Sequence, residues 1–310
     1  MQRLFDRCPT IPVDSSLSLA RYCMTLKQTL LQAEQYMSAG DAERSALLHI
    51  RCVQVANRTL PAHPEYSLPQ NEQWLKELRR ITGKCLISLE HLKGQIEVSP
   101  KIDSMDVSVA KQSRVSQNRP LEIEEGVLQV LERMSSETTQ SGAQSIGLLA
   151  GKLEEIGQDA SKLRVAALVV PHQRGSKDNC EMLDEMNILG LQEAKGLFVL
   201  GWLVVNVDGS KEPSPTELRS HAGFQAMMPE CVVGIVDPNE PTQCKFFGLT
   251  ELGLSFILRY SDRIGETNMS SHIPDGYPGA GSPLYKEAQH VQKIQARETT
   301  PSFKVCKFCS

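Results

Sequence analysis

The chain has 310 residues, of which 40% are hydrophobic and 23% charged, and its formal net charge at pH 7 is −4. This length and apolar content can supply two hydrophobic cores, which favours two domains. The slightly acidic balance excludes the overall basic field that binds nucleic-acid backbones, so we expect no nucleic-acid partner. The longest nearly uncharged apolar run, residues 196–207, is too short for a transmembrane helix, so we also expect no transmembrane segment.

The first residues show no secretion signal, and the last residues show only an incomplete metal-binding motif. Met1 to Asp6 lack the continuous apolar stretch of a secretion signal, so we expect a cytoplasmic chain whose nine scattered cysteines are free thiols. Cys306 and Cys309 have the spacing of half a zinc site, but no second Cys or His pair lies nearby in the sequence. We therefore predict a disordered tail over residues 297–310.

The first third of the chain has a helical apolar pattern and a positive charge excess. Residues 1–96 contain 12 Lys and Arg against 9 Asp and Glu, whereas the remainder contains 21 against 28. Apolar residues recur at every third or fourth position over residues 19–37, 46–53 and 74–96. This pattern predicts a small three-helix bundle over residues 1–98.

The rest of the chain predicts a linker and a domain of strands and helices. Residues 99–120 are poor in large apolar residues and rich in Ser, Lys, Asp and Gln, which is typical of a flexible linker. Interleaved strand and helix patterns then predict an α/β or α+β domain over residues 121–296. The strand candidates are 146–153, 163–170, 197–207, 232–236 and 246–249, and the helix candidates are a segment through Val127 and Met134, then 180–191 and 217–228.

Local catalytic motifs are absent from the sequence. No two of the seven histidines have the H-x-H or H-E-x-x-H spacing of a zinc site. The G-x-S-x-G, P-loop and dinucleotide patterns are missing as well. The residues by themselves therefore define no catalytic centre.

Several segments, taken together, nevertheless match one family in order and spacing. The front carries LSLARY at 17–22, HPEY at 63–66 and LPQ at 68–70, and the back carries GLLAGKL at 147–153, VPHQ at 170–173, LGWL at 200–203, MPE at 228–230 and FFGLT at 246–250. These segments resemble the AMSH-type JAMM/MPN+ deubiquitinases, zinc peptidases that trim ubiquitin chains at endosomes. The resemblance implies an α+β multidomain fold with an MIT-like N-terminal bundle that contacts ESCRT-III tails. It implies an MPN/JAMM-type α/β domain, similar to cytidine deaminases, behind that bundle.

The resemblance also places the family's metal ligands on particular residues. Active members follow Gly-Trp-Ile/Leu with H-x-H, then seven residues, Ser, two residues and Asp. Here the two His positions carry Val204 and Asn206, and the Asp position carries Glu217. A His of the family's second zinc site falls on Arg219, and the later Cys and H-x-H of that site are not found near residues 260–272. Valine has no lone pair and a carboxamide is a poor substitute for imidazole, so we expect no zinc or other cofactor.

The family's catalytic residues are only partly present. The serine survives as Ser214, whereas the catalytic Glu falls on Gln144, which cannot accept a proton. Without zinc, water would keep a pKa near its bulk value and the nucleophile would be lost at neutral pH. Without a metal, Val204 becomes a core strand residue, Trp202 is simply packed, and Asn206 and Glu217 become surface or cap residues, with Glu217 opening the following helix. We expect His172 and His221 to be single solvated or hydrogen-bonded histidines.

The leading interpretation is a catalytically inactive AMSH-like pseudo-deubiquitinase, an adaptor that is cytoplasmic and peripheral at endosomes. Its expected partners are ubiquitin or polyubiquitin, ESCRT-III-type acidic helical tails and a catalytic MPN paralogue. Arg79, Arg80 and Lys84 would steer such a tail into a groove of the front bundle. Two alternatives stay open: an active zinc isopeptidase that cleaves chains linked through lysine sixty-three of ubiquitin, and a structural ESCRT-binding scaffold that does not touch ubiquitin.

Overall fold

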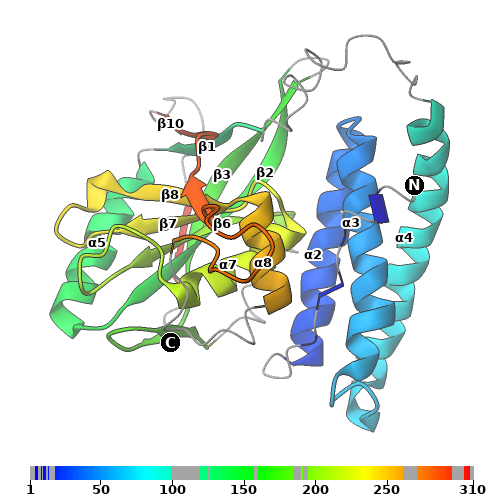
Figure 1. The fold of residues 1–310 in the computed structure, drawn as a ribbon, viewed down its shortest axis with the longest axis horizontal. Helices are drawn as coiled ribbons and strands as arrows, with labels where there is room; N and C mark the ends of the chain where they lie inside the picture. The colour runs from blue at the N-terminus through cyan, green and yellow to red at the C-terminus, as the bar shows by residue number, and fades with distance from the viewer. Residues whose placement is uncertain are drawn as a thin grey trace. The chain divides into compact units, whose positions relative to one another are not determined.

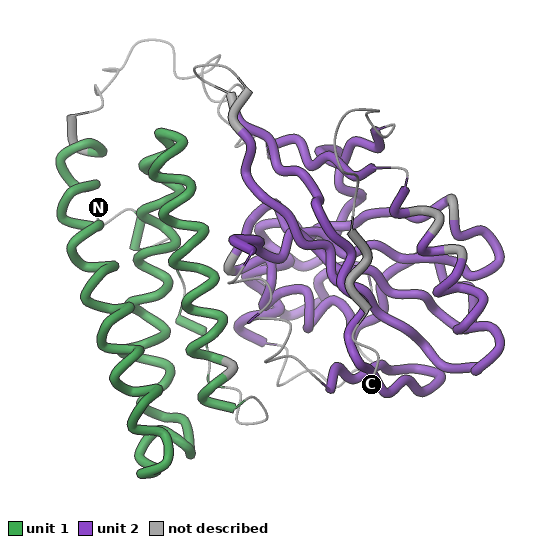
Figure 2. Tube along the Cα trace, turned by 180° about the vertical axis from the view of Figure 1, so that it is seen from behind, with its two compact units in different colours: residues 1–118 green, residues 119–310 purple. Residues whose placement is uncertain are grey.

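A computed structural model describes residues 4–5, 8, 10–11, 13, 18–98, 119–124, 126–156, 160–183, 190, 195–260, 271–294 and 304–307. The chain divides into two compact units, Met1–Asn118 and Arg119–Ser310 (Figure 2). Unit 1 is helical, and unit 2 combines helices with a mixed sheet (Figure 1). The predicted α+β fold class is confirmed. Most of the predicted linker, residues 99–118, lies outside the described residues.

Unit 1 is built from α2 (Leu19–Ser38), α3 (Ala42–Gln54) and α4 (Glu72–Val98), and irregular helical turns over Val55–Asn71 connect the last two. Between α2 and α3, Gly40 has a φ of 73°, which glycine adopts without strain. Asp41 then caps α3, because its side chain accepts a hydrogen bond from the backbone N–H of Arg44 at 3.0 Å. The apolar stripes predicted from the sequence form the core of the unit: Leu19, Cys23, Leu26, Leu30, Ala46, Ile50, Leu78, Ile81, Cys85, Leu89 and Leu92 are buried.

The HPEY segment holds the start of α2. Glu65 Oε2 accepts a hydrogen bond from the backbone N–H of Leu19 at 2.8 Å, in the place where an N-cap side chain normally acts. His63 is buried, receives a hydrogen bond from the backbone N–H of Glu65 at 3.1 Å and packs edge-on against the ring of Tyr22. Asp14 and Ser15 precede the apolar pattern of α2 and are of the residue types that cap helices, but they lie outside the described residues.

The described strands of unit 2 form a nine-stranded sheet in the order β10-β1-β3-β2-β6-β7-β8-β9, with β11 also paired to β3. Their bounds are β1 (Leu121–Glu124), β2 (Ser145–Ile156), β3 (Ala160–Val170), β6 (Phe198–Val205), β7 (Val232–Val236), β8 (Lys245–Leu249), β9 (Tyr285–Glu287), β10 (Val291–Ile294) and β11 (Lys304–Lys307). The hairpin of β4 (Gln173–Gly175) and β5 (Cys180–Met182) forms a separate two-stranded sheet. The central strand β2 is antiparallel to both β3 and β6, and β6 is parallel to β7.

The sheet buries side chains on both faces. On one face, Leu149, Leu203 and Val205 belong to the same core as α5 (Gly126–Ser141). On the other face, Ile146, Trp202 and Val204 pack together, and Phe224 of α7 (Pro215–Met227) packs against them. A further core joins α7 to α8 (Glu251–Tyr260). The strand β6 is therefore buried from both sides, as its continuous apolar run indicates.

Three parts of unit 2 differ from the sequence-based expectations. The prediction of a helix over residues 180–191 is wrong at its first residues, because Cys180–Met182 form β5 and pair with Gln173–Gly175. The helix α5 is preceded by the strand β1, which pairs in parallel with β3 and β10. In the tail that we expected to be disordered, Lys304–Lys307 form β11, which pairs in parallel with β3.

Two further observations concern the described cysteines and helices. Among the described residues, no disulfide bond joins Cys8, Cys23, Cys52, Cys85, Cys180, Cys231 or Cys244 to another cysteine. Of the helices that the structure describes, none combines the length and apolar character needed to cross a membrane.

Candidate functional site

Strand register brings the first two predicted site residues together. Ser145 of β2 lies opposite Val205 of β6 in the antiparallel ladder. Gln144 comes directly before Ser145, and Asn206 comes directly after Val205. The same register therefore places Gln144 and Asn206 opposite each other at the end of the strand pair. Their side chains meet directly, because Gln144 Nε2 donates a hydrogen bond to Asn206 Oδ1 at 2.7 Å.

The start of α7 supplies the next two residues. Ser214 is the N-cap of this helix, Pro215 occupies the first helical position and Glu217 is the third helical residue. The Glu217 backbone N–H donates to Ser214 Oγ at 3.3 Å, and Glu217 Oε2 accepts from the backbone N–H of Ser214 at 2.7 Å. This is a complete capping box, and it confirms the expectation that Glu217 opens the helix.

Glu217 also closes the polar cluster. Its second oxygen, Oε1, accepts a hydrogen bond from Gln144 Nε2 at 3.1 Å, so the Gln144 amide donates to Asn206 and Glu217 at once. All three side chains are buried, with exposed fractions of 9%, 5% and 6% for Gln144, Asn206 and Glu217. Asn206 is therefore not the surface residue that its polar side chain suggests. We call Gln144, Asn206 and Glu217 the amide–carboxylate cluster.

Burial has a predictable effect on the carboxylate of the cluster. Loss of solvation raises the pKa of Glu217, and the hydrogen bonds from Ser214 and Gln144 oppose this rise. Both carboxylate oxygens already accept a hydrogen bond. The cluster therefore satisfies its buried polar groups internally, which is what a buried carboxylate requires.

The donors at this position do not fit a catalytic zinc ion. Val204 is fully buried in the apolar core of the sheet, as expected for a strand residue, and has no donor atom. Asn206 Oδ1 and both oxygens of Glu217 are engaged in hydrogen bonds within the protein. Among the residues that the structure describes, no group of three His, Cys, Asp or Glu side chains could hold a metal ion. Zinc needs three protein ligands at such a site, and this arrangement offers a single carboxylate.

The remaining predicted positions lie apart from the cluster or next to it. Arg219 is half-buried on α7, about 200° around the helix from Glu217, so the two residues lie on different sides of that helix. His172 is exposed after β3. Trp202 is buried, as expected for a packed residue.

One buried contact beside the cluster was not assigned from the sequence. His221, one turn after Glu217, is fully buried and receives a hydrogen bond from Trp202 Nε1 at its Nδ1, over 3.3 Å. Burial lowers the pKa of His221 to about 4, so the imidazole is neutral at pH 7. Glu217 and His221 are four residues apart on α7, and Trp202 in β6 is four residues before Asn206, which follows the strand; this matching spacing is the signal that could have found the contact.

The three basic residues predicted for peptide binding all lie on α4, each in different surroundings. Arg80 pairs with Glu77, with an Nη2–Oε1 distance of 2.6 Å, and Lys84 lies 3.9 Å from Glu34 of α2. Arg79 is exposed and lies about 100° around the helix from Arg80.

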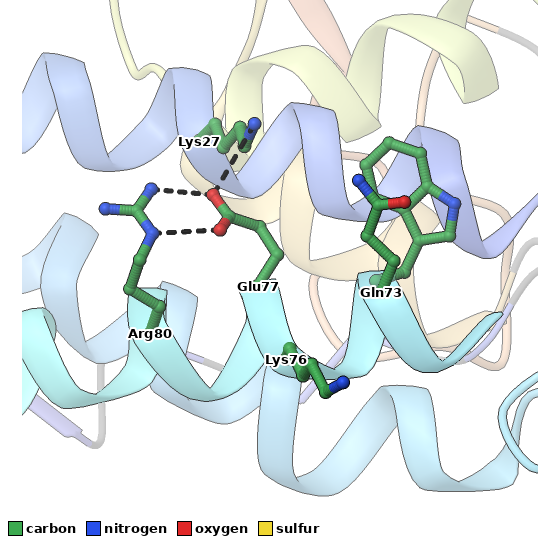
Figure 3. Close-up of a pocket in the computed structure, with 6 residues that line it drawn as sticks. Lys27, Gln73, Lys76, Glu77 and Arg80 are labelled. Carbon is green, nitrogen blue, oxygen red and sulfur yellow. Dashed lines mark hydrogen bonds and ion pairs between the residues drawn. The ribbon is translucent and has the colours of Figure 1, made fainter.

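Between α2 and α4 lies a pocket of about 350 Å³, which we call the α2–α4 pocket (Figure 3). It is lined by Lys27, Gln73, Trp74, Lys76, Glu77 and Arg80, so Arg80 is the one predicted basic residue that reaches it. Glu77 lies between Arg80 and Lys27, and Lys27 Nζ is 3.5 Å from Glu77 Oε1 (Figure 3). The hydrogen bonds from Arg80, together with Lys27, lower the pKa of Glu77 to about 2. The pocket therefore combines an aromatic side chain with three cations and one carboxylate.

Comparisons with known proteins find one family profile and several relatives. A family profile described as the USP8 dimerisation domain matches residues 1–98. AMSH-like ubiquitin thioesterase 1 from Arabidopsis thaliana is 28% identical over 172 residues, which are 55% of this chain and 32% of that protein. AMSH-like ubiquitin thioesterase 2 from the same plant is 25% identical over 176 residues, which are 56% of this chain and 74% of that protein. A STAM-binding protein-like relative from Xenopus laevis is 30% identical over 125 residues, 40% of this chain and 29% of its own length.

The helical front, the α+β back and these matches together support an AMSH-type JAMM family member. The alignment with the first of these relatives spans about a third of that relative's length.

Proposed function

We propose that this chain is a catalytically inactive AMSH-like pseudo-deubiquitinase that acts as an adaptor for ubiquitin and ESCRT proteins in endosomal sorting. The amide–carboxylate cluster is the observation that carries the proposal. At the positions where active family members hold zinc and a general base, Gln144, Asn206 and Glu217 bond to one another. A metal-activated water has no ligand set here, and the Gln144 amide cannot act as a base.

The proposal extends to the two folds and their boundaries. We infer that residues 1–98 form an MIT-like bundle and residues 121–296 an MPN/JAMM-type domain, with a linker over 99–120 and a tail over 297–310. The convergence of the starts of β2 and α7 with the end of β6 supports the second inference, because the resemblance places the family's site at those three points. A rigid, metal-free version of that site can keep the fold and its outer surfaces while losing catalysis.

The partners follow from the same reasoning. The similarity to ubiquitin thioesterases and to a STAM-binding protein-like relative supports ubiquitin or polyubiquitin as one ligand and the endosome surface as the place of action. A catalytic MPN paralogue would be a second partner and would supply the zinc site that we do not find among the described residues of this chain.

The direct test uses the full chain with polyubiquitin linked through lysine sixty-three of ubiquitin. We expect the chain to retain polyubiquitin in a pull-down, to leave it uncleaved with or without added zinc, and to contain far less than one zinc ion per molecule. Cleavage together with bound zinc would favour the active isopeptidase. Neither binding nor cleavage would favour the scaffold that does not touch ubiquitin.

The α2–α4 pocket supports a second role, the binding of ESCRT-III-type acidic helical tails. Lys27, Lys76 and Arg80 line the same pocket as the half-buried Trp74, so an acidic amphipathic peptide could bury an apolar side chain there and face the three cations. Glu77 holds Lys27 and Arg80 in place. Lys84 lies one turn beyond Arg80 and extends the basic rim.

This role is tested by titrating the full chain with such a peptide at low and at physiological salt. We expect modest affinity that falls with salt and that Arg80→Gln weakens about threefold to tenfold. Arg79→Gln is the matched control, because Arg79 does not line the pocket. Equal losses for the two variants would contradict a role for this pocket.

A further inference from the structure

Two cations of the α2–α4 pocket converge on a single oxygen atom. Arg80 Nη2 donates a hydrogen bond to Glu77 Oε1 at 2.6 Å, and Lys27 Nζ lies 3.5 Å from the same oxygen (Figure 3). Arg80 Nε also donates to Glu77 Oε2 at 2.8 Å, so the guanidinium holds the carboxylate at two points, which is the geometry that it also offers to phosphate. Glu77 Oε1 therefore lies where an oxygen of a bound oxyanion would lie.

The carboxylate of Glu77 does not balance the charge of this pocket. Three cations, Lys27, Lys76 and Arg80, line the pocket. Glu77 is the one acidic residue among the described residues of the lining, so an excess of two positive charges remains. Glu72 pairs with Lys76 at 3.0 Å from outside the pocket, but the two side chains are 70% and 67% exposed, and pairs exposed to this degree contribute little. The lining therefore still attracts an anion.

The charge of the incoming anion decides whether it can replace Glu77. A single peptide carboxylate gains little at this position, because it exchanges one carboxylate for another and also loses the free motion of a separate molecule. A phosphate monoester carries a charge of about −1.5 to −2 at pH 7 and has three strong acceptor oxygens. It can therefore accept hydrogen bonds from Lys27 and Arg80 together and balance more of the positive charge. The pocket favours phosphate over carboxylate.

The shape of the pocket favours a peptide side chain over a lipid headgroup. The pocket has a volume of about 350 Å³, lies between α2 and α4, and contains the half-buried Trp74 beside the cations. Proteins that bind a membrane surface present apolar and aromatic side chains outward, into the boundary between headgroups and acyl chains. A tryptophan within a pocket instead packs against an apolar side chain of a ligand that enters from a partner protein.

We propose that the α2–α4 pocket binds a phosphoserine side chain of a partner helix, and that the phosphate displaces Glu77 from Lys27 and Arg80. This inference rests on the proposed peptide-binding role of the same pocket and names the ligand that the pocket selects. Glu77 acts as an internal competitor, because it keeps the two cations together in the free chain and occupies the position that they share. Phosphorylation of the partner then switches its binding on.

The test is fluorescence anisotropy of the full chain with three labelled versions of one synthetic acidic amphipathic helix. The versions carry serine, glutamate or phosphoserine at the same position. At physiological salt we expect the phosphoserine version to bind at least about tenfold more tightly than the serine version, and the glutamate version to bind nearly as weakly as serine. Lys27→Gln and Arg80→Gln should each remove most of this gain. Lys93→Gln, an exposed lysine of α4 that does not line the pocket, should keep it.

Glu77→Gln separates competition by Glu77 from simple support of the cations. As an internal competitor, Glu77 opposes the phosphate, so we expect this variant to bind the phosphoserine version about threefold to tenfold more tightly than the wild type. Weaker binding would show that Glu77 only holds the cations in place, and it would overturn displacement. Glu90→Gln is the matched control, because it removes one negative charge from an exposed position of the same helix outside the pocket, and it should leave binding unchanged.

Two further probes distinguish the sources of phosphate. Inorganic phosphate should compete only weakly with the phosphoserine version, because it makes no apolar contact with Trp74. Phosphatidylcholine vesicles with added phosphatidylinositol phosphate should not bind the chain more than vesicles without it. Vesicle binding that Arg80→Gln abolishes, without any preference for the phosphoserine version, would replace the proposal with a lipid ligand.

The outcomes also separate this inference from the proposed role on which it rests. Equal binding of the serine and phosphoserine versions, lost in Arg80→Gln, would overturn the selection of phosphate and leave the binding of acidic tails intact. No binding of any version would overturn both. Tight binding of the phosphoserine version that survives both Lys27→Gln and Arg80→Gln would mean that the phosphate binds elsewhere, and the assignment to this pocket would be wrong.

Discussion

Two regions of this molecule differ in which side chains they bury and which they expose. In unit 2, the amide–carboxylate cluster buries three polar side chains and bonds them to one another. In unit 1, the outward face of α4 leaves Leu86 and Ile87 in solvent. The polar side chains of the first region satisfy one another, whereas the apolar side chains of the second are not covered by the described residues of unit 1. The comparison teaches that buried polar groups of one domain can be satisfied internally while apolar side chains of another domain stay in contact with solvent.

The largest expected effect comes from replacing the residues of the amide–carboxylate cluster and Val204 with the metal ligands and base of active family members. The combined variant Gln144→Glu, Val204→His, Asn206→His and Glu217→Asp restores the ligands and the base that the family resemblance places there. We expect about one zinc ion per molecule by metal analysis, because ligand identity is a local property. Cleavage of polyubiquitin should recover much less, because catalysis also needs placement within about 0.5 Å and supporting hydrogen bonds.

The single variant Val204→His is the control for this prediction. It should bind no stoichiometric zinc, because Asn206 and Glu217 remain bonded to Gln144. Restored cleavage by this variant alone would mean that the site is far less altered than its hydrogen bonds indicate.

Removal of one member of the cluster should be costly. Glu217→Ala deletes half of the capping box and leaves the buried Gln144 amide short of an acceptor. We expect a loss of about 2–4 kcal/mol in the free energy of unfolding. Urea denaturation followed by Trp202 fluorescence, in a Trp74→Phe background, measures unit 2 specifically.

Glu251→Ala supplies the matched control, since Glu251 also lies in the first turn of a helix but is exposed. It should cost no more than about 0.5 kcal/mol. Similar losses for the two variants would mean that the cluster contributes only a helix cap.

The neighbour of the cluster should make stability depend on pH in a defined direction. The pKa of His221 falls from 6.5 to about 4 on folding because the ring is buried. Between these values the unfolded chain binds a proton that the folded chain does not, so stability is lost as pH falls from about 6.5 to about 4. The loss amounts to about 3 kcal/mol. Glu217, whose pKa is raised, has the opposite effect: its contribution is lost as pH rises through the folded-state pKa.

His221→Gln should remove the His221 component, so the difference in stability between wild type and variant should narrow toward pH 4. His172→Gln, at an exposed position, should leave the pH profile unchanged. Parallel profiles for wild type and His221→Gln would show that the ring does not titrate as its burial requires.

The sequence predicts local features of the cluster better than its contacts. The spacing of Ser214 and Glu217 indicates a capping box, and Val204 ends an apolar run, so both roles follow from neighbouring residues. The contact of Gln144 with Asn206 depends on how β2 and β6 are aligned, and nothing in either segment alone fixes that alignment. The burial of Asn206 was missed for the same reason.

Short strands were the other source of error. Each of β5 and β11 is too short to show a period of two residues. The strand Cys180–Met182 exists because it pairs with Gln173–Gly175, and Lys304–Lys307 because it pairs with β3. The local sequence of the first segment favours a helix, and that of the second favours a tail. Both strands depend on pairing with distant segments, so only the tertiary structure reveals these strands.

The smallest expected effect lies on the open face of α4. Ile87→Gln should change the free energy of unfolding by no more than about 0.5 kcal/mol, because the side chain is already in solvent. Ile81→Gln, the same substitution less than two turns away on the same helix, should cost roughly 3 kcal/mol or more, because Ile81 is fully buried. Amide hydrogen exchange in α3 and α4 reports on unit 1 separately from unit 2. A large loss of amide protection in Ile87→Gln would mean that the Ile87 side chain is covered within the chain. The contrast between the buried polar cluster and the exposed apolar face of α4 would then be wrong.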